Sequence, residues 1–231
     1  MSEWYKVGVL GSNVHSIVMS SNSMSGRLPT SISSLKHLRM IELATMPSLS
    51  GSLPEEICML TSLKRLCICR CGIRGQIPNK IGDLTELEEL QLFGNNFSGA
   101  IPLSMSKLVN LRLLSLGEYT GGNQFASCPL PDSLSNLTQL EALFMANCNV
   151  RGPIPFWIGN FKCLRQLDLQ RNQLTGPLPE SIGNCESMLY LNLKDNSGLT
   201  GYLPVEALVK DECSLFYTIV SYALYKFYRP G

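Results

Sequence analysis

The sequence is poor in the residues and motifs on which catalysis depends. Its 231 residues include only two histidines, His15 and His37, so acid–base chemistry near neutral pH has few candidates. It contains no glycine-rich phosphate loop, no kinase His-Arg-Asp motif, and neither His-Glu-x-x-His nor Gly-x-Ser-x-Gly. We therefore predict that the protein is not an enzyme, has no catalytic residues and uses no cofactor.

An excess of charge of either sign is also missing. Nineteen Lys and Arg residues nearly balance eighteen Asp and Glu residues, and the basic residues form no cluster. Nothing in this charge pattern attracts nucleic acid. The mostly apolar stretch at 214–228 contains Lys226 and is too short to span a bilayer as a helix. We expect no nucleic-acid partner, and contact with a membrane only if the chain belongs to a longer receptor.

What the sequence does contain is a repeat. Prolines preceded by Leu or Ile recur at steps of 25, 24, 24, 29, 24, 24 and 25 residues, and seven of the eight follow a glycine by three residues. They are Pro29, Pro54, Pro78, Pro102, Pro131, Pro155, Pro179 and Pro204. A period of this length indicates a solenoid, in which each unit buries its apolar face only against its neighbours.

The spacing of apolar residues predicts the structure of one unit. Leu164, Leu167 and Leu169 end in a period-two alternation typical of a short strand. Pro179, Ile182 and Cys185 have a three-residue spacing that favours a 3₁₀ turn or a short helix. We therefore predict an α/β solenoid of about eight repeats, with one strand per repeat in a parallel sheet and 3₁₀ or short helices behind it.

A repeated position three residues past each predicted strand is rich in Asn. Such a side chain can satisfy backbone groups that would otherwise be buried without partners. The predicted structural ladder comprises Asn22, Cys71, Asn95, Cys148, Asn172 and Asn196, while Met46 and Tyr119 occupy the same position in two other units. We interpret its cysteines as small buried hydrophobes.

The segment Leu87-Glu-Glu-Leu-Gln-Leu-Phe-Gly-Asn-Asn-Phe-Ser-Gly-Ala-Ile-Pro102 resembles the plant-specific class of leucine-rich repeats found in receptor-like kinases, receptor-like proteins and polygalacturonase inhibitors. The resemblance implies a right-handed superhelix with a concave sheet and a convex helical side. It covers residues 14–207 as repeats of about 24 residues and makes 1–13 a degenerate N-terminal cap, with Trp4 and Val9 in place. We predict that 208–231 forms a C-terminal cap or tail; a juxtamembrane remnant and a truncation artefact are the alternatives.

Two observations predict the compartment. The N-terminus has no secretory signal, and Ser2 and Leu10 stand near the places of the two cap cysteines of the resembled family. The cysteine count of nine is odd, which favours reduced thiols. We therefore predict a cytoplasmic location, with the extracellular face of the plasma membrane as the alternative for a receptor fragment. The sequons at Asn96 and Asn136 matter only in that second case.

Side chains that alternate with the strand leucines are expected to face outward on the concave side. The predicted partner-binding residues are Glu42, Arg65, Glu89, Gln91, Phe93, Phe144, Gln166, Asp168, Gln170, Tyr190, Asn192 and Lys194. The aromatic residues among them are of the type that most often anchors interfaces, or else they pack flat on the sheet without a partner.

Two further local features bear on function. The repeat containing residues 117–129 is five residues longer than its neighbours, and we expect its insertion to leave the sheet after the strand, as a binding loop or as a neutral insertion. The segment Cys67-Ile-Cys-Arg-Cys71 lacks the Cys-x-x-Cys spacing of zinc sites, so we predict no metal site.

These observations leave three functions open. The first is a free-standing, monomeric module that binds a protein or peptide through its concave sheet in signalling or defence. The second is the ligand-sensing ectodomain fragment of a receptor-like kinase or receptor-like protein. The third is an inhibitor of a secreted hydrolase. The fold alone does not choose among them.

Overall fold

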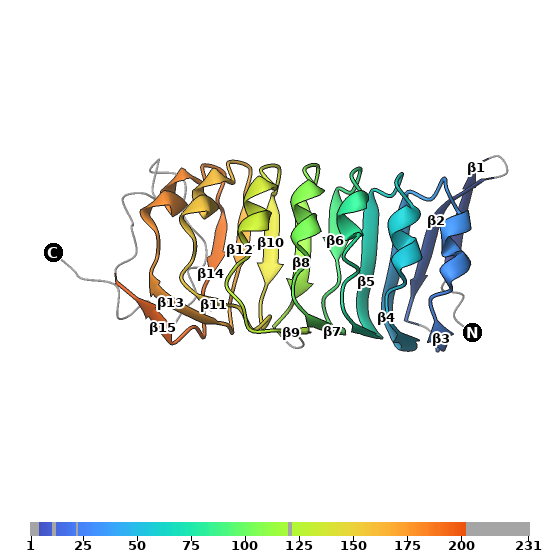
Figure 1. Cartoon of the computed structure of the whole chain (residues 1–231), viewed down its shortest axis with the longest axis horizontal. Helices are drawn as coiled ribbons and strands as arrows, with labels where there is room; N and C mark the ends of the chain where they lie inside the picture. The colour runs from blue at the N-terminus through green and yellow to red at the C-terminus, as the bar shows by residue number, and fades with distance from the viewer. Residues whose placement is uncertain (1–4, 11–12, 22, 120–121, 202–231) are drawn as a thin grey trace.

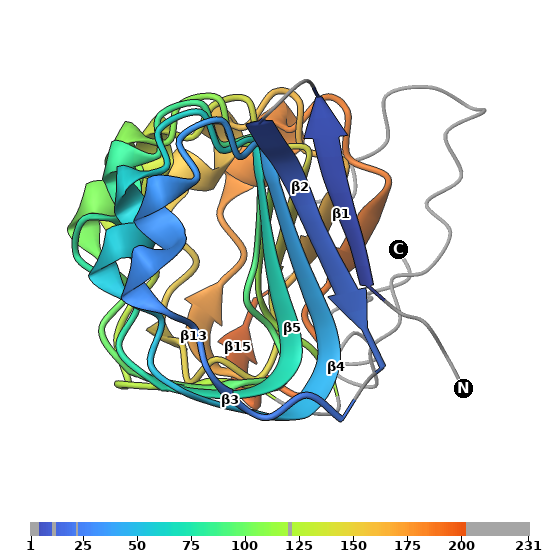
Figure 2. The same ribbon diagram turned by 90° about the vertical axis from the view of Figure 1, so that its right-hand side faces the viewer.

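The structure is a computed structural model that describes residues 5–10, 13–21, 23–119 and 122–201. Its repeats stand side by side along one long axis (Figure 1), with the main sheet on one side and a row of 3₁₀ helices on the other (Figure 2). The predicted ladder residue Asn22 and the predicted C-terminal segment 208–231 lie outside the described residues.

The main sheet contains one strand from each repeat. Its order is β1-β2-β4-β5-β6-β8-β10-β12-β14, and all neighbours pair in parallel except β1 and β2, which are antiparallel. The strands are β1 Tyr5–Leu10, β2 Asn13–Ser20, β4 Met40–Gly51, β5 Arg65–Gly75, β6 Glu89–Gln91, β8 Leu113–Gly117, β10 Ala142–Met145, β12 Gln166–Asp168 and β14 Tyr190–Asn192. The parallel sheet of the predicted solenoid is thus confirmed.

The second residue in each of six consecutive strands, β5, β6, β8, β10, β12 and β14, is a leucine that determines the register. Leu66 pairs with Leu90, Leu90 with Leu114, Leu114 with Leu143, Leu143 with Leu167 and Leu167 with Leu191. All six are buried. A slip of one residue would turn every one of these leucines toward solvent, so burial selects this register.

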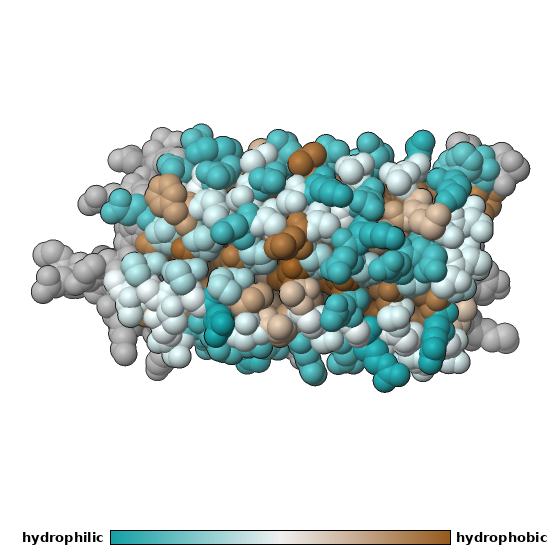
Figure 3. Space-filling model, viewed as in Figure 1, coloured by the Kyte–Doolittle hydropathy of each residue, from teal (hydrophilic) through white to brown (hydrophobic). Residues whose placement is uncertain are grey.

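Short 3₁₀ helices form the opposite side, as the three-residue spacing predicts. They are η1 Thr30–Ser34, η2 Glu55–Met59, η3 Ile81–Asp83, η4 Leu103–Lys107, η5 Asp132–Asn136, η6 Phe156–Asn160 and η7 Glu180–Asn184. The repeat proline starts each of them by accepting a bond from the amide three residues later, as in Ile57 N to Pro54 O at 3.1 Å. The helical face is largely hydrophilic, with small groups of apolar side chains (Figure 3), and Leu103 and Phe156 are its most exposed large apolar residues.

A second row of strand pairs was not predicted from the sequence. It comprises β3 Gly26–Arg27, the final parts of β4 and β5, β7 Asn96–Gly99, β9 Gln124–Phe125, β11 Arg151–Gly152, β13 Gln173–Pro177 and β15 Gly198–Thr200. The row lies at the edge where the chain leaves the main sheet (Figure 2). A residue with positive φ makes the bend in most repeats, as at Arg70 (φ 52°) and Asn147 (φ 54°).

This second row is interrupted beside the long repeat. Strand β9 pairs with β7 but not with β11, and only an isolated bridge from Cys128 to Val150 continues the row. Asn123 lies nine residues after the strand leucine Leu114, whereas in the regular repeat Asn95 lies five after Leu90. Four of the five extra residues therefore precede Asn123. The fifth lies between Asn123 and Pro131, which are eight residues apart, whereas Asn95 and Pro102 in the regular repeat are seven apart.

Among the residues that the structure describes, no helix has the length and apolar character needed to traverse a lipid bilayer.

Candidate functional site: the concave face and the cleft beside it

The asparagine ladder holds consecutive repeats together. Asn95 donates through Nδ2 to Ile68 O at 2.6 Å, Leu92 O at 3.0 Å and Phe93 O at 3.2 Å, and its Oδ1 accepts from Cys71 N. Asn172 and Asn196 make the corresponding bonds to their own and the preceding repeat. Cys71 and Cys148 lie buried in this row, and each thiol donates to a carbonyl. The row keeps the strands rigid.

In the long repeat the ladder residue is Asn123, not Tyr119. Asn123 is buried, donates to Leu92 O at 2.9 Å and Leu116 O at 2.7 Å, and accepts from Phe97 N at 3.0 Å. Tyr119 is 47% exposed. Counting residues from the strand assigned Tyr119 to the ladder, and that assignment is wrong because the insertion precedes the ladder position.

The structure brings the predicted partner-binding residues together on the open side of the main sheet, which we call the concave face. Partly or fully exposed are Glu42, Arg65, Glu89, Gln91, Phe93, Phe144, Gln166, Tyr190 and Lys194, whereas Asp168, Gln170 and Asn192 are buried. These residues were expected to face outward on the concave side; the last three are buried there because Gln170 and Asn192 both bond to Asp168 along the sheet.

The carboxylate of Asp168 is the centre of that buried group. It accepts from Gln170 N at 3.0 Å, Gln170 Nε2 at 2.8 Å and Asn192 Nδ2 at 3.2 Å. Burial raises the pKa of Asp168, and these hydrogen bonds oppose the rise. The group is a rigid polar floor.

Toward the N-terminal end, the concave charges pair with one another. Arg65 bonds to Glu89 at 2.7 Å and lies 3.9 Å from Glu42, and Gln91 donates to Glu89 at 3.4 Å. All of these side chains are partly exposed, so the pairs contribute little stability. This end of the face carries charges of both signs, and a polar ligand can replace these pairs with its own hydrogen bonds to the same side chains.

A hollow of about 290 Å³ lies in the middle of the concave face. Small residues make room for it: Ser115 and Gly117 on β8, and Ala146 at the end of β10. Phe93 and Phe144 also line the hollow, as do Asp168 and Gln170 from the polar floor. The combination of aromatic and polar lining suits a single side chain of a bound peptide.

The start of the insertion forms a rim along this hollow. The Arg70 guanidinium donates to both carboxylate oxygens of Glu118, with the shortest distance 2.7 Å. The Arg171 guanidinium stacks on the Tyr119 ring at 3.8 Å from its centroid and pairs with Asp195 at 3.5 Å. The insertion leaves the sheet after β8 as predicted. Its contacts to repeats two units away on either side were not predicted, and its unusual length was the only signal.

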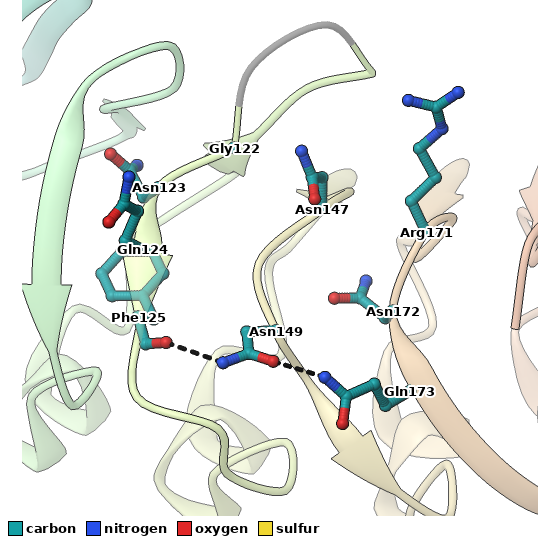
Figure 4. Close-up of a pocket in the computed structure, with 9 residues that line it drawn as sticks. All are labelled: Gly122, Asn123, Gln124, Phe125, Asn147, Asn149, Arg171, Asn172 and Gln173. Carbon is teal, nitrogen blue, oxygen red and sulfur yellow. Dashed lines mark hydrogen bonds between the residues drawn. The ribbon is translucent and has the colours of Figure 1, made fainter.

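A second hollow of about 490 Å³ lies beyond the rim (Figure 4). It occupies the interruption of the second strand row. Its lining comes from three consecutive repeats: Gly122, Asn123, Gln124, Phe125, Asn147, Asn149, Arg171, Asn172 and Gln173. We call it the lateral cleft. From the sequence, Asn172 was singled out for the ladder and residues 117–129, which contain Gly122 to Phe125, as an insertion, but these residues were not brought together in a site.

Two cysteines of strand β5, Cys67 and Cys69, touch each other. Cys67 and Cys69 are buried, with their Sγ atoms 3.2 Å apart. The hydrogen bond between them lowers the pKa of Cys67 and raises that of Cys69, whose burial adds to the rise. Within the described residues, no group of three His, Cys, Asp or Glu side chains is placed to hold a metal ion.

Comparisons with known proteins agree with this geometry. A leucine-rich repeat region model matches residues 17–152, and a single leucine-rich repeat model matches residues 163–185. A solenoid of stacked repeats with a rigid ladder and an open sheet is a recognition scaffold. The chain belongs to the leucine-rich repeat family. A search of curated protein sequences found no match.

Solved structures define the class more closely. The plant peptide hormone receptor RGFR1, in complex with RGF2, is 31% identical with a TM-score of 0.74, over 82% of this chain and 30% of the receptor. The Arabidopsis receptor kinase HAESA, in complex with the peptide hormone IDA and the co-receptor SERK1, is 30% identical with a TM-score of 0.68, over 82% of this chain and 35% of that one. This chain thus spans about a third of the length of these two receptor chains.

The comparisons overturn the predicted cytoplasmic location. The leucine-rich-repeat ectodomain of the Arabidopsis thaliana membrane receptor kinase GASSHO1/SCHENGEN3 also matches, at 26% identity and a TM-score of 0.63 over 84% of this chain and 25% of that chain. Ectodomains lie outside the cell, which points to an extracellular location. The prediction was wrong because it relied on a missing signal and missing cap cysteines, and a segment that spans a third of its relatives does not reveal its compartment in that way. That the chain lacks catalytic activity stays a prediction.

Proposed function

We propose that this chain is the ligand-sensing part of an extracellular plant-type receptor and binds a peptide along its concave face. The observation that carries the proposal is the central hollow, in which Phe93 and Phe144 flank a floor of small residues beside the buried polar group of Asp168. Partly exposed aromatic side chains held on a rigid sheet lose little entropy when a ligand covers them. The peptide complexes of the two matched receptors support the same class of ligand.

The rim favours a peptide over a flat protein surface. Glu118 and Tyr119 extend from the end of β8 and line one side of the hollow. A narrow bordered hollow accepts an extended chain that inserts one anchor side chain. The other predicted partner-binding residues lie along the concave face on both sides of the hollow, from Glu42 at one end to Lys194 at the other, and would contact the rest of the peptide. We propose no role as a free-standing cytoplasmic module or as a hydrolase inhibitor.

A displayed library of random linear peptides, selected against the purified chain, tests this function. Enriched peptides should lose at least about tenfold in affinity to Phe144→Ala, since burying an aromatic anchor commonly contributes more than 1.4 kcal/mol. Lys107→Ala, on the helical side in η4, is the matched control and should bind as the parent does. Circular dichroism melts should confirm that both variants fold.

Two results would contradict the proposal. One is a selection that enriches no peptide. The other is a set of enriched peptides that Phe144→Ala and Lys107→Ala weaken equally, which would place binding elsewhere than the concave face.

A further inference from the structure

The lateral cleft has a chemistry unlike that of the concave face. Among the described residues that line it, none carries a carboxylate and six carry side-chain amides: Asn123, Gln124, Asn147, Asn149, Asn172 and Gln173. Its one aromatic residue, Phe125, is 2% exposed and so offers almost no apolar surface. Its volume of about 490 Å³ lies within the range of small-ligand sites, about 300–1,000 Å³.

The one charged lining residue is already engaged. Arg171 pairs with Asp195 at 3.5 Å, stacks on Tyr119 and donates to the Tyr119 carbonyl at 3.4 Å. A strongly anionic ligand would have to displace these contacts, and a cationic ligand would find no carboxylate. The cleft therefore favours a neutral, polar ligand.

Four of the six amides are held, those of Asn123 and Asn172 within the ladder, and two are free to bind. Asn149 donates to Phe125 O at 3.1 Å and accepts from Gln173 at 2.6 Å, a chain of bonds that crosses the cleft in Figure 4. Gln124 and Asn147 are exposed, and among the described residues their side-chain amides have no hydrogen-bond partner. Each amide pairs a donor with an acceptor in one plane.

Interrupted strand pairing keeps the cleft open. Gly122 lies against the next repeat, where an added Cβ would stand 1.7 Å from Asn147 O, while β9 remains unpaired with β11. The amides thus come from three repeats and do not form a continuous strand edge. An extended peptide would need such an edge for its main chain, whereas neighbouring hydroxyls can bond to separate amides.

We propose that the lateral cleft binds a neutral oligosaccharide, with Gln124 and Asn147 as hydrogen-bonding residues and the Asn149–Gln173 pair as its floor. This site is separate from the concave face, and it does not depend on the proposed peptide binding. The ligand is defined by its chemistry: adjacent sugar hydroxyls, without charge.

Nuclear magnetic resonance of the ¹⁵N-labelled chain provides the test, because side-chain amide signals report directly on these residues. Three probes are titrated separately to about 10 mM, a range suited to weak sites: cellohexaose, which is neutral; hexagalacturonate, which is anionic; and pentaglycine, which supplies only peptide main chain. We expect cellohexaose to shift the signals of Gln124, Asn147, Asn149 and Gln173 in a saturable manner.

The variants identify the site. The double variant Gln124→Ala with Asn147→Gly removes both free amides, and glycine tolerates the positive φ of residue 147. It should weaken cellohexaose binding about tenfold or more, as expected for two lost hydrogen bonds. Asn110→Ala, which removes an exposed amide bonded to Thr85 O away from the cleft, should leave binding unchanged. Phe144→Ala should also leave it unchanged, so a failure here is distinct from a failure of peptide binding.

Three outcomes would overturn the proposal: no saturable shift with cellohexaose, stronger binding of hexagalacturonate or pentaglycine at the same signals, or equal weakening by the double variant and by Asn110→Ala.

Discussion

Arg70 and Glu118 lie two repeats apart and meet above Gly94. The two side chains form a bidentate ion pair with a shortest distance of 2.7 Å. A Cβ on residue 94 would come within 2.7 Å of Arg70 Cγ and 2.9 Å of Glu118 Oε1. Gly94 also has a φ of +68°. Because Gly94 has no side chain, Arg70 can reach across its repeat and pair with Glu118 of the insertion.

Gly94→Ala should destabilise the protein more than Gly152→Ala. Both glycines have positive φ, so each alanine adds strain of about 1–2 kcal/mol. An added Cβ at residue 152 has nothing within 4 Å, whereas at residue 94 it meets both partners of the ion pair. We expect an extra loss of about 1 kcal/mol for Gly94→Ala, at the upper end of the range for an ion pair at the surface, because Arg70 is exposed while the Glu118 side chain is mostly covered. Urea unfolding measures both; equal losses would mean that the ion pair does not depend on Gly94.

Replacing Asn123 should be far more damaging than replacing Tyr119. Asn123→Ala leaves buried backbone groups of Leu92, Leu116 and Phe97 without their partner, at about 1–3 kcal/mol for each orphaned group. Tyr119→Ala removes one exposed ring from Arg171, which costs about 0.5–1 kcal/mol. Thermal unfolding of the two variants side by side would contradict the ladder assignment if Tyr119→Ala proved the more destabilising.

Asp168 should make the protein less stable as the pH rises. Burial raises its pKa in the folded state above the ordinary value of 3.8, so the folded protein binds more protons than the unfolded chain in the interval between the two pKa values. Stability then falls as pH increases through that interval. Asp168→Asn lacks this contribution. The free energy of unfolding of the variant minus that of the parent should therefore increase as the pH is raised from about 3 to about 6.

The measurement is a series of urea unfolding curves for the parent and Asp168→Asn across that pH range. Since the other carboxylates are common to both proteins, the difference isolates Asp168. A difference that is constant with pH would mean that the hydrogen bonds to Asp168 balance burial, and a change in the opposite direction would mean that they outweigh it; either result would contradict the prediction.

Asn96 and Asn136 should carry N-linked glycans when the chain passes through a secretory pathway. Both begin Asn-x-Ser/Thr sequons and both are exposed, on β7 of the second strand row and at the end of η5 on the helical side. Neither lies on the concave face, so glycans there would leave the proposed peptide site open. Intact mass of the secreted protein, compared with Asn96→Gln and Asn136→Gln, measures the occupancy; an unmodified secreted chain would contradict the prediction.

Much of the fold follows from local pattern. Leu164, Leu167 and Leu169 could be assigned to one buried strand face, and Pro179 and Ile182 to a 3₁₀ turn, because repeated spacing restricts each unit to one way of stacking. The second strand row escaped prediction. Its strands, such as Arg151–Gly152, are as short as two residues and have no alternation of their own. Their pairing exists only once the repeats are stacked.

The sequence by itself determined the repeat, its register and the residues that share the concave face, since a leucine every 24 residues leaves few alternatives for burial. Only the tertiary structure decided that Asp168 and Asn192 bond to each other across two strands and become buried. Only the tertiary structure showed that Asn123 is the ladder residue of the long repeat and that Glu118 and Tyr119 reach separate repeats. The contacts of Asp168, Glu118 and Tyr119 join residues 24 to 52 positions apart. Their distances depend on how stacked strands align, which no local spacing encodes.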